Sequence, residues 1–194
     1  MLRKILALSL GLSLAACGGG GNASEKAEAN ENADKAATAQ RQARTDIAEA
    51  LGASADHSNF MQALETAGLT QTLRGVGPYT VFAPNNAAFA AIPADAREGL
   101  NDPGQRERLI ALLSYHIVPG TVTAQDLGRA IDRGQNGRAE LATVAGDNLT
   151  VSRDGDDLVI GDAAGGRSRI LQADQLHSNG VVHSVDVVLM PGAE

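Results

Sequence analysis

Residues 179–191 read NGVVHSVDVVLMP and contain Val181–Met190, the strongest predicted strand in the chain of 194 residues. His183 alternates along this strand with valine and leucine, so its side chain is expected to face a buried core. Asn179 and Gly180 precede the strand, and a glycine that permits positive φ explains the pair as a tight turn better than as a ligand-binding loop. The stretch therefore predicts a buried strand that a turn introduces.

Outward from this strand, the sequence pattern divides the chain in two. Residues 46–116 favour helices around one short strand, whereas residues 117–190 favour strands separated by glycine turns. This order predicts an α+β fold and disfavours alternating βαβ units. In the first part, Ser58 can cap the start of a helix that Gly68 ends. In the second part, Asp154-Gly155 favours a tight hairpin turn.

A second informative stretch, residues 80–89, reads TVFAPNNAAF. It predicts a short buried strand that Pro84 terminates, because proline cannot donate to a neighbouring strand. Asn85 then supplies a side-chain oxygen that can accept a hydrogen bond from the first turn of a helix.

A third stretch, residues 112–120, reads LLSYHIVPG. Leu112, Leu113 and His116 fall on one face of a predicted helix, so His116 is explained as a buried histidine bonded to the backbone or to Tyr115.

These three stretches, in this order and spacing over residues of about 46–191, resemble the fasciclin (FAS1) domain family of extracellular and membrane-attached adhesion modules. The resemblance implies a wedge-shaped β-sandwich with helices packed at one edge and side. Two positions depart from the family pattern: Asn85 stands where Thr or Ser is commoner, and Ser184 where an aliphatic residue is commoner. The residues that carry the resemblance are Thr80, Phe82, Pro84, Asn85, Phe89, Asn179, Gly180, His183 and Asp186.

In animal members of the family, the Tyr-His segment has been proposed to contact integrins. The resemblance therefore implies a candidate interaction site at Tyr115 and His116, while the integrin itself does not carry over. His57 and His177 lie near predicted loops and are expected to be solvated.

The N-terminal residues predict export. Residues 1–16 run from a basic pair into an apolar stretch too short to span a membrane and are expected to be a signal peptide. Residues 14–17 read LAAC and resemble the lipobox of bacterial lipoproteins, which makes Cys17 the predicted lipidation site; the alternative is an ordinary signal peptide with an incidental cysteine. Residues 17–44 then form the lipidated cysteine and a flexible tether, and residues 45–194 form one fasciclin-like domain.

Charge and composition restrict the partners. Loss of Arg3 and Lys4 with the signal peptide would leave 14 basic against 23 acidic residues, a charge of about −9 that repels nucleic acid and anionic lipid. A single cysteine excludes disulfides within the chain. Position 18 is glycine, whereas enterobacterial lipoproteins that are retained in the inner membrane carry aspartate there. This difference favours the outer membrane, with the domain on the periplasmic or cell-surface face.

No motif indicates an enzyme, a metal site or a cofactor: the sequence lacks a Gly-x-Ser-x-Gly elbow, a His-Glu-x-x-His pair and a phosphate loop. Residues 153–157, RDGDD, offer carboxylates to calcium but not the spacing of an EF-hand. The leading hypothesis is an envelope-tethered adhesion or protein-interaction module whose partner is a protein or matrix component. The alternatives are a lipoprotein that binds a small apolar ligand between helices and sheet, and a hydrolase-like enzyme that uses His116 and His183.

Overall fold

The computed structural model describes residues 44–92 and 103–192. The predicted signal peptide, the lipidated Cys17 and the tether as far as residue 43 lie outside the described residues. Helical elements dominate the first part, as the sequence pattern predicts. They are α2 (Ile47–Ala53), η1 (Ala55–His57), α3 (Ser58–Ala67), α4 (Thr70–Leu73), α5 (Asn86–Ala90), η2 (Pro103–Gln105) and α7 (Arg106–Tyr115), followed later by α8 (Ala124–Arg133) and η3 (Gln135–Gly137).

Seven strands form one sheet in the order β2-β1-β7-β6-β5-β4-β3. β1 and β7 pair in parallel, and the other neighbours pair antiparallel. The strands are β1 (Tyr79–Pro84), β2 (Ile117–Pro119), β3 (Arg138–Ala142), β4 (Asn148–Asp154), β5 (Asp157–Gly161), β6 (Arg167–His177) and β7 (Gly180–Val185). The β4–β5 hairpin turns at Gly155, whose φ is +63°, as the Asp-Gly step predicts.

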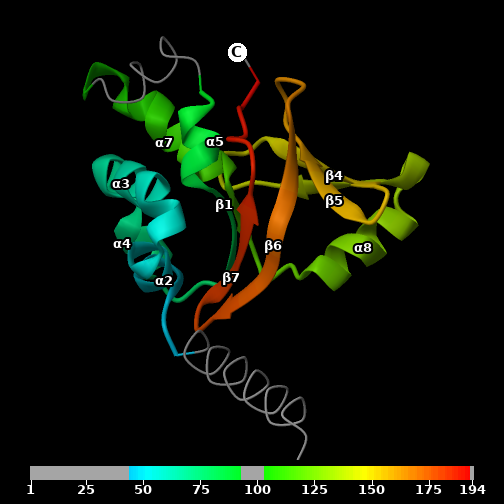
Figure 1. Ribbon diagram of the computed structural model, residues 1–194, viewed down its shortest axis with the longest axis horizontal. Helices are drawn as coiled ribbons and strands as arrows, with labels where there is room; N and C mark the ends of the chain where they lie inside the picture. The colour runs from blue at the N-terminus through cyan, green and yellow to red at the C-terminus, as the bar shows by residue number, and fades with distance from the viewer. Residues whose placement is uncertain (1–43, 93–102, 193–194) are drawn as a thin grey trace, which may run out of the picture. The chain divides into compact units, whose positions relative to one another are not determined.

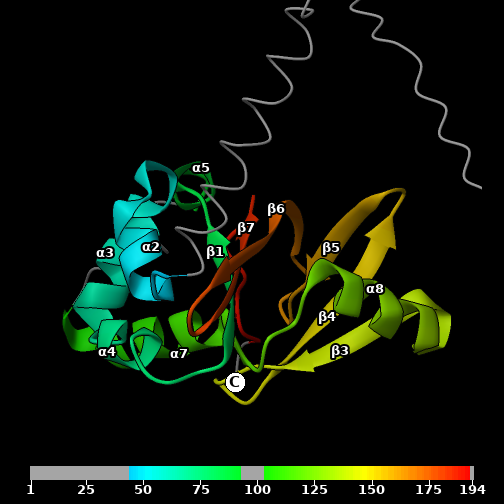
Figure 2. The same ribbon diagram turned by 90° about the horizontal axis from the view of Figure 1, so that it is seen from below.

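The sheet folds on itself along β6. Residues 167–169 of this strand pair with β5, whereas residues 170–177 pair with β7 and slip in register twice. Asp174 lies in this irregular region with φ at +58°. Figure 2 shows the result: β1 and β7 form one half, and β3, β4 and β5 diverge from it to form the other. This α+β arrangement agrees with the wedge-shaped sandwich that the resemblance implies.

Two apolar cores flank the β1–β7 half of the sheet. Helices α2, α3, α4 and α7 cover its first face (Figure 1). The side chains that fill this contact are at most 3% exposed and include Ile47, Leu51, Phe60, Leu64, Leu73, Leu109, Leu113, Val81 and Val182. The helical layer is thus joined to the sheet by close packing.

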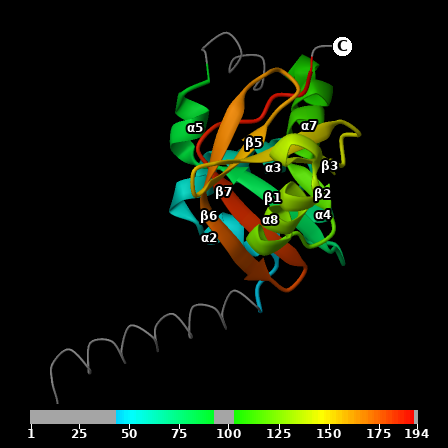
Figure 3. The ribbon, with the colours of Figure 1, turned by 90° about the vertical axis from the view of Figure 1, so that its right-hand side faces the viewer.

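The second core lies between the two halves of the sheet, where α8 packs (Figure 3). Thr123 and Asp126 form a reciprocal capping box at the start of α8, which fixes the helix as it enters this position. Leu127 and Ile131 of the helix then contact the apolar face of β4. The side chains of this core include Phe82, Tyr115, Leu127, Ile131, Leu149, Val151, Ile160, Val185 and Leu189.

Two local predictions are wrong in detail. β7 ends at Val185 and does not reach Met190, because the Asp186 carboxylate turns back to accept hydrogen bonds from the Arg169 amide at 2.7 Å and the Ser168 hydroxyl at 3.2 Å. Ser58 does not cap α3; it is the first helical residue, although Gly68 ends this helix in the predicted left-handed conformation, with φ at +79°.

Among residues 44–92 and 103–192, no helix has the length and apolar character needed to cross a membrane.

Candidate functional site

The three signature stretches lie side by side at one end of the sheet, where β2, β1 and β7 are neighbours. β1 pairs with β2 on one side and with β7 on the other. The amide of Phe82 donates to the carbonyl of His116 across 2.9 Å, and the amide of Asn85 donates to the carbonyl of Val185 across 3.1 Å. The stretches that carry the resemblance therefore form one hydrogen-bonded unit.

Tyr115, in the last turn of α7, is fully buried. Its hydroxyl donates to the carbonyl oxygen of Asn148 at 3.1 Å and accepts a hydrogen bond from the amide of Ala163 at 3.0 Å. Burial raises the pKa of the phenol above its ordinary value, so the hydroxyl remains protonated at neutral pH. This side chain ties α7 to the start of β4 and to the turn after β5.

His116, the next residue, is also fully buried. Its Nδ1 donates to the carbonyl oxygen of Leu112 at 2.8 Å, and its Nε2 accepts a hydrogen bond from the amide of Leu189 at 3.0 Å. Burial lowers the pKa of the ring from 6.5 to about 4. The imidazole is therefore neutral, and both ring nitrogens are used to hold the backbone.

The candidate interaction site at Tyr115 and His116 is enclosed by the domain, since both side chains are 0% exposed. A partner could reach them only if the domain opened. His116 is thus a buried histidine bonded to the backbone, as the sequence predicts. An interaction on this side of the domain therefore remains a prediction. It would involve the surface around Tyr115 and His116 and not these two side chains.

Asn179 connects the turn before β7 to the helical layer. Its Oδ1 accepts a hydrogen bond from the amide of Ile47 at 3.0 Å, while its Nδ2 donates to the carbonyls of Leu73 at 2.6 Å and Gly75 at 3.0 Å. Gly180 follows, where a β-carbon would overlap the backbone of β1. Both residues are thus required by the fold, in agreement with the turn interpretation.

His183 faces the second core, as its alternation along the strand predicts. Its ring stacks on Phe82 with centroids 5.5 Å apart, and its Nε2 donates to the carbonyl of Val122 at 2.8 Å. The amide of Asp174 donates to Nδ1 at 3.2 Å, so this ring is also bonded on both sides. Burial lowers its pKa. Thr80 supports the same loop, donating from Oγ1 to the carbonyl of Gly120 at 2.7 Å.

The end of β1 behaves as predicted. Pro84 is the last residue of the strand, and the Oδ1 of Asn85 accepts a hydrogen bond from the amide of Ala88 at 2.8 Å. The departure to asparagine at this position therefore preserves the cap. Phe89 then packs near Phe60 of α3, with ring centroids 6.3 Å apart.

A buried polar pair, His57 and Ser184, was not predicted from the sequence. His57 is 5% exposed, so its predicted solvation is wrong. Its Nε2 lies 2.9 Å from the hydroxyl oxygen of Ser184 and its Nδ1 lies 2.8 Å from that of Ser54. The pair lines a hollow of about 290 Å³ between η1, α5 and β6. The signal that could have found it is Ser184 itself, a hydroxyl where the family commonly has an aliphatic side chain.

Ser184 and His57 are less suited to nucleophilic catalysis than the serine and histidine of a catalytic triad. A catalytic triad orients its histidine with a carboxylate, whereas here the second ring nitrogen of His57 faces the hydroxyl of Ser54. Burial lowers the pKa of His57, which disfavours proton uptake from a nucleophile. The pair therefore fits a polar link between the helical layer and β7.

The acidic turn after β4 pairs with arginines of β6. Asp154 lies 3.8 Å from Arg167, and Asp157 lies 3.4 Å from Arg169. Within the described part of the chain, we find no group of three His, Cys, Asp or Glu side chains placed to hold a metal ion.

Comparison with known proteins finds relatives of the described domain. A family model described as the Fasciclin domain matches residues 55–191. Protein sll1483 of Synechocystis is 37% identical over 166 residues, which cover 83% of this chain and 83% of that protein. The cell surface glycolipoprotein MPB83 of Mycobacterium bovis is 33% identical over 127 residues, which cover 65% of this chain but only 49% of that protein.

A solved structure shows the same fold. The FAS1 domain pair of the insect cell adhesion molecule fasciclin I matches with a TM-score of 0.67 at 17% identity, over 76% of this chain and 51% of that chain. The family model spans more than half of the chain and contains all three signature stretches. The chain therefore belongs to the fasciclin domain family.

Proposed function

We propose that this chain is an adhesion or protein-interaction module that a lipid on Cys17 holds at an extracytoplasmic membrane surface. The observation that carries the proposal is the fasciclin domain, joined in one chain to the LAAC run at residues 14–17. MPB83 is named a cell surface glycolipoprotein, and fasciclin I is named a cell adhesion molecule. Both names support a function outside the cytoplasm.

The proposed placement is the outer membrane, on its periplasmic or exterior face, because Gly18 stands where an inner-membrane retention signal would carry aspartate. A diacylglyceryl group and an N-acyl chain on Cys17 would exceed the two signals that stable anchoring needs. Residues 18–44 would then tether the domain near the membrane, where many copies could bind one surface together.

The proposed module performs no catalysis. His116 and His183, the histidines of the hydrolase alternative, bond to backbone groups through both ring nitrogens and are neutral at pH 7. A general base needs a free nitrogen within reach of a substrate. Their arrangement supports a structural role.

A small apolar ligand between the helices and the sheet has little support from the packing. The side chains at this contact fill it themselves: Phe60, Leu64 and Leu73 are each 0% exposed. A ligand there would have to displace part of a close-packed core.

The test is attachment by a strain that lacks the gene, complemented with the native chain or with Cys17→Ser. We expect the native chain to restore attachment and to be labelled by a fatty-acid probe, and Cys17→Ser to do neither. Protease treatment of intact cells would decide which membrane face carries the domain. Unchanged attachment in the deletion strain on every surface tested would refute adhesion, and full adhesion by unlabelled, soluble Cys17→Ser would refute the role of the anchor.

A further inference from the structure

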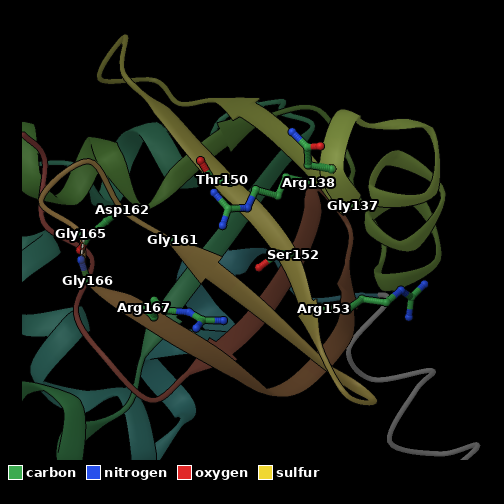
Figure 4. Close-up of a pocket in the computed structure, with 11 residues that line it drawn as sticks. Gly137, Arg138, Thr150, Ser152, Arg153, Gly161, Asp162, Gly165, Gly166 and Arg167 are labelled. Carbon is green, nitrogen blue, oxygen red and sulfur yellow. Dashed lines mark hydrogen bonds between the residues drawn. The ribbon is translucent and has the colours of Figure 1, made fainter.

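An open hollow of about 430 Å³ lies on the outer face of β3, β4 and β5, opposite to the face that packs on α8 (Figure 4). Register places its residues together: Ser152 pairs with Arg138, and Gly161 pairs with both Thr150 and Arg167. The volume is within the roughly 300–1,000 Å³ of small-molecule sites. We call this feature the arginine hollow.

Two arginines face each other across the arginine hollow. Arg138 of β3 and Arg167 of β6 extend over its floor from opposite sides, and both are exposed (Figure 4). Arg153 lines the rim but points away from the centre, and its guanidinium lies close to Gly128 of α8. Two guanidinium groups therefore line one open hollow of an otherwise acidic protein.

The nearby carboxylates leave this positive charge available. Arg167 lies 3.8 Å from Asp154, but both side chains are more than 60% exposed, and such a solvated pair is worth about 1 kcal/mol or less. Asp162, at the edge, accepts hydrogen bonds from two backbone amides. Glu140 of β3 accepts from Asn148 at 3.2 Å. An incoming anion would thus compete with the exposed pair and would meet the charge of Asp162 at the edge.

Gly161 forms the floor of the arginine hollow without being required by the fold. Its φ is not in the left-handed region, and a β-carbon there would meet nothing closer than the carbonyl oxygen of Thr150 at 3.6 Å. Any side chain at this position would stand in the space between the two arginines. The glycine therefore keeps the floor open, at a strand position where β-branched residues are ordinarily favoured.

We propose that the arginine hollow binds a carboxylate-bearing sugar of an acidic polysaccharide. Guanidinium groups match carboxylates in shape and charge, while the hydroxyls of Thr150 and Ser152 are placed to bond sugar hydroxyls. The lining residues include no aromatic side chain, which is one of the anchors that protein interfaces favour. The net charge, −7 for the full chain and about −9 without residues 1–16, opposes polyanions at long range, but salt screens it beyond about 10 Å, so the local charge decides.

The experiment measures binding of trigalacturonate to the full chain carrying Cys17→Ser, by calorimetry and by amide NMR shifts. Maltotriose is the neutral probe, and inorganic phosphate and phosphatidylglycerol vesicles are the other anions. We expect Arg138→Gln/Arg167→Gln to weaken trigalacturonate binding at least about tenfold, as loss of charge-assisted bonds should. Gly161→Val should weaken it similarly with no change of charge. The matched control, Arg74→Gln/Arg108→Gln, removes two exposed arginines elsewhere and should change affinity less than about twofold.

Shifts confined to Thr150, Ser152 and Gly161 would support the proposal. It is overturned if trigalacturonate does not bind, if the control pair loses as much affinity as the hollow pair, or if maltotriose binds equally well. Tighter binding of phosphate or of the vesicles would overturn the sugar as occupant. The inference rests on the proposed adhesive function because it names a class of partner. Calorimetry tests the site and the attachment assay tests adhesion, so the two failures are distinguishable.

Discussion

The hydroxyl oxygen of Ser184 lies 2.9 Å from Nε2 of His57, although 127 positions separate the two residues in the chain. Both side chains are buried, at 5% exposure each. A serine at this position of β7 departs from the aliphatic residue that the family pattern favours, and His57 explains the departure by supplying a polar partner. Each residue supplies the hydrogen-bond partner that the other needs when it is buried.

Double substitution tests this pairing. Ser184→Val should destabilise the domain by about 1–3 kcal/mol, because it leaves Nε2 of His57 buried without a partner. His57→Leu should destabilise the domain by a similar amount, because it leaves the hydroxyl of Ser184 without this partner. The double variant should be less destabilised than the sum of the two, since both polar groups are then gone. Urea unfolding at pH 7.5 measures all four free energies.

A suitable control is Thr66→Val, which removes an exposed hydroxyl bonded to the carbonyl of Gln62 and should change stability by less than about 0.5 kcal/mol. Strict additivity of the two buried substitutions would show that Ser184 and His57 do not depend on each other.

Acid should destabilise the domain through its buried histidines. The pKa of His116 is lowered from 6.5 to about 4, and burial also lowers the pKa of His57 and His183. Because the unfolded chain takes up these protons more readily, stability is complete above about pH 6.5 and is lost as the pH falls toward 4. The contribution of His116 alone is on the order of 3 kcal/mol.

The measurement is the free energy of unfolding in urea at half-unit steps from pH 7.5 to pH 5, above the range where most carboxylates titrate. His116→Asn can still donate to the carbonyl of Leu112, so it should fold, with lower stability and a flatter pH dependence. Equal stability of the native chain at pH 7.5 and pH 5 would contradict the assignment of neutral, buried histidines.

The sequence was sufficient for features that depend on neighbouring residues. The cap at Asn85, the left-handed Gly68 and the inward direction of His183 follow from spacing along one element, and the structure has all three. The three signature stretches also predicted the α+β fold, and they prove to be adjacent strands.

Features that depend on residues far apart in the sequence could not be predicted from spacing along one element. β7 ends at Val185 because Asp186 bonds to β6, which no alternation of apolar residues reveals. The position of His57 near a loop suggested solvent, but Ser184 and the helical layer enclose it. Arg138 and Arg167 line the same hollow only because the register of β3, β4, β5 and β6 brings them together, and the sequence does not specify this register.

Tyr115→Phe separates a structural from a direct functional role of the Tyr-His segment. The substitution keeps the ring in the second core and removes the hydroxyl that bridges Asn148 and Ala163. We expect a loss of about 1–3 kcal/mol in thermal or urea unfolding, with attachment unchanged at temperatures where the variant is folded. Loss of attachment by a variant of native stability would instead assign Tyr115 a direct contact.

Asn179 should be the most sensitive asparagine of the signature stretches. Its amide group bonds to three backbone groups of the helical layer, on Ile47, Leu73 and Gly75, and it is 8% exposed. Asn179→Ala leaves all three without this partner and should cost on the order of 3 kcal/mol or more. Asn85→Ala, which removes a single helix cap, should cost about 1 kcal/mol.

Asn179→Asp tests whether a side chain of the same shape, without the Nδ2 donor, can maintain the stability of the domain. A carboxylate can still accept the amide of Ile47, but it has no hydrogen to donate and would face the carbonyl oxygens of Leu73 and Gly75. We therefore expect it to be at least as destabilising as Asn179→Ala at pH 7.5, in urea unfolding. If Asn179→Asp were as stable as the native chain, the bonds from Nδ2 would not hold the helical layer to β7, and the packing of the first core would have to do so alone.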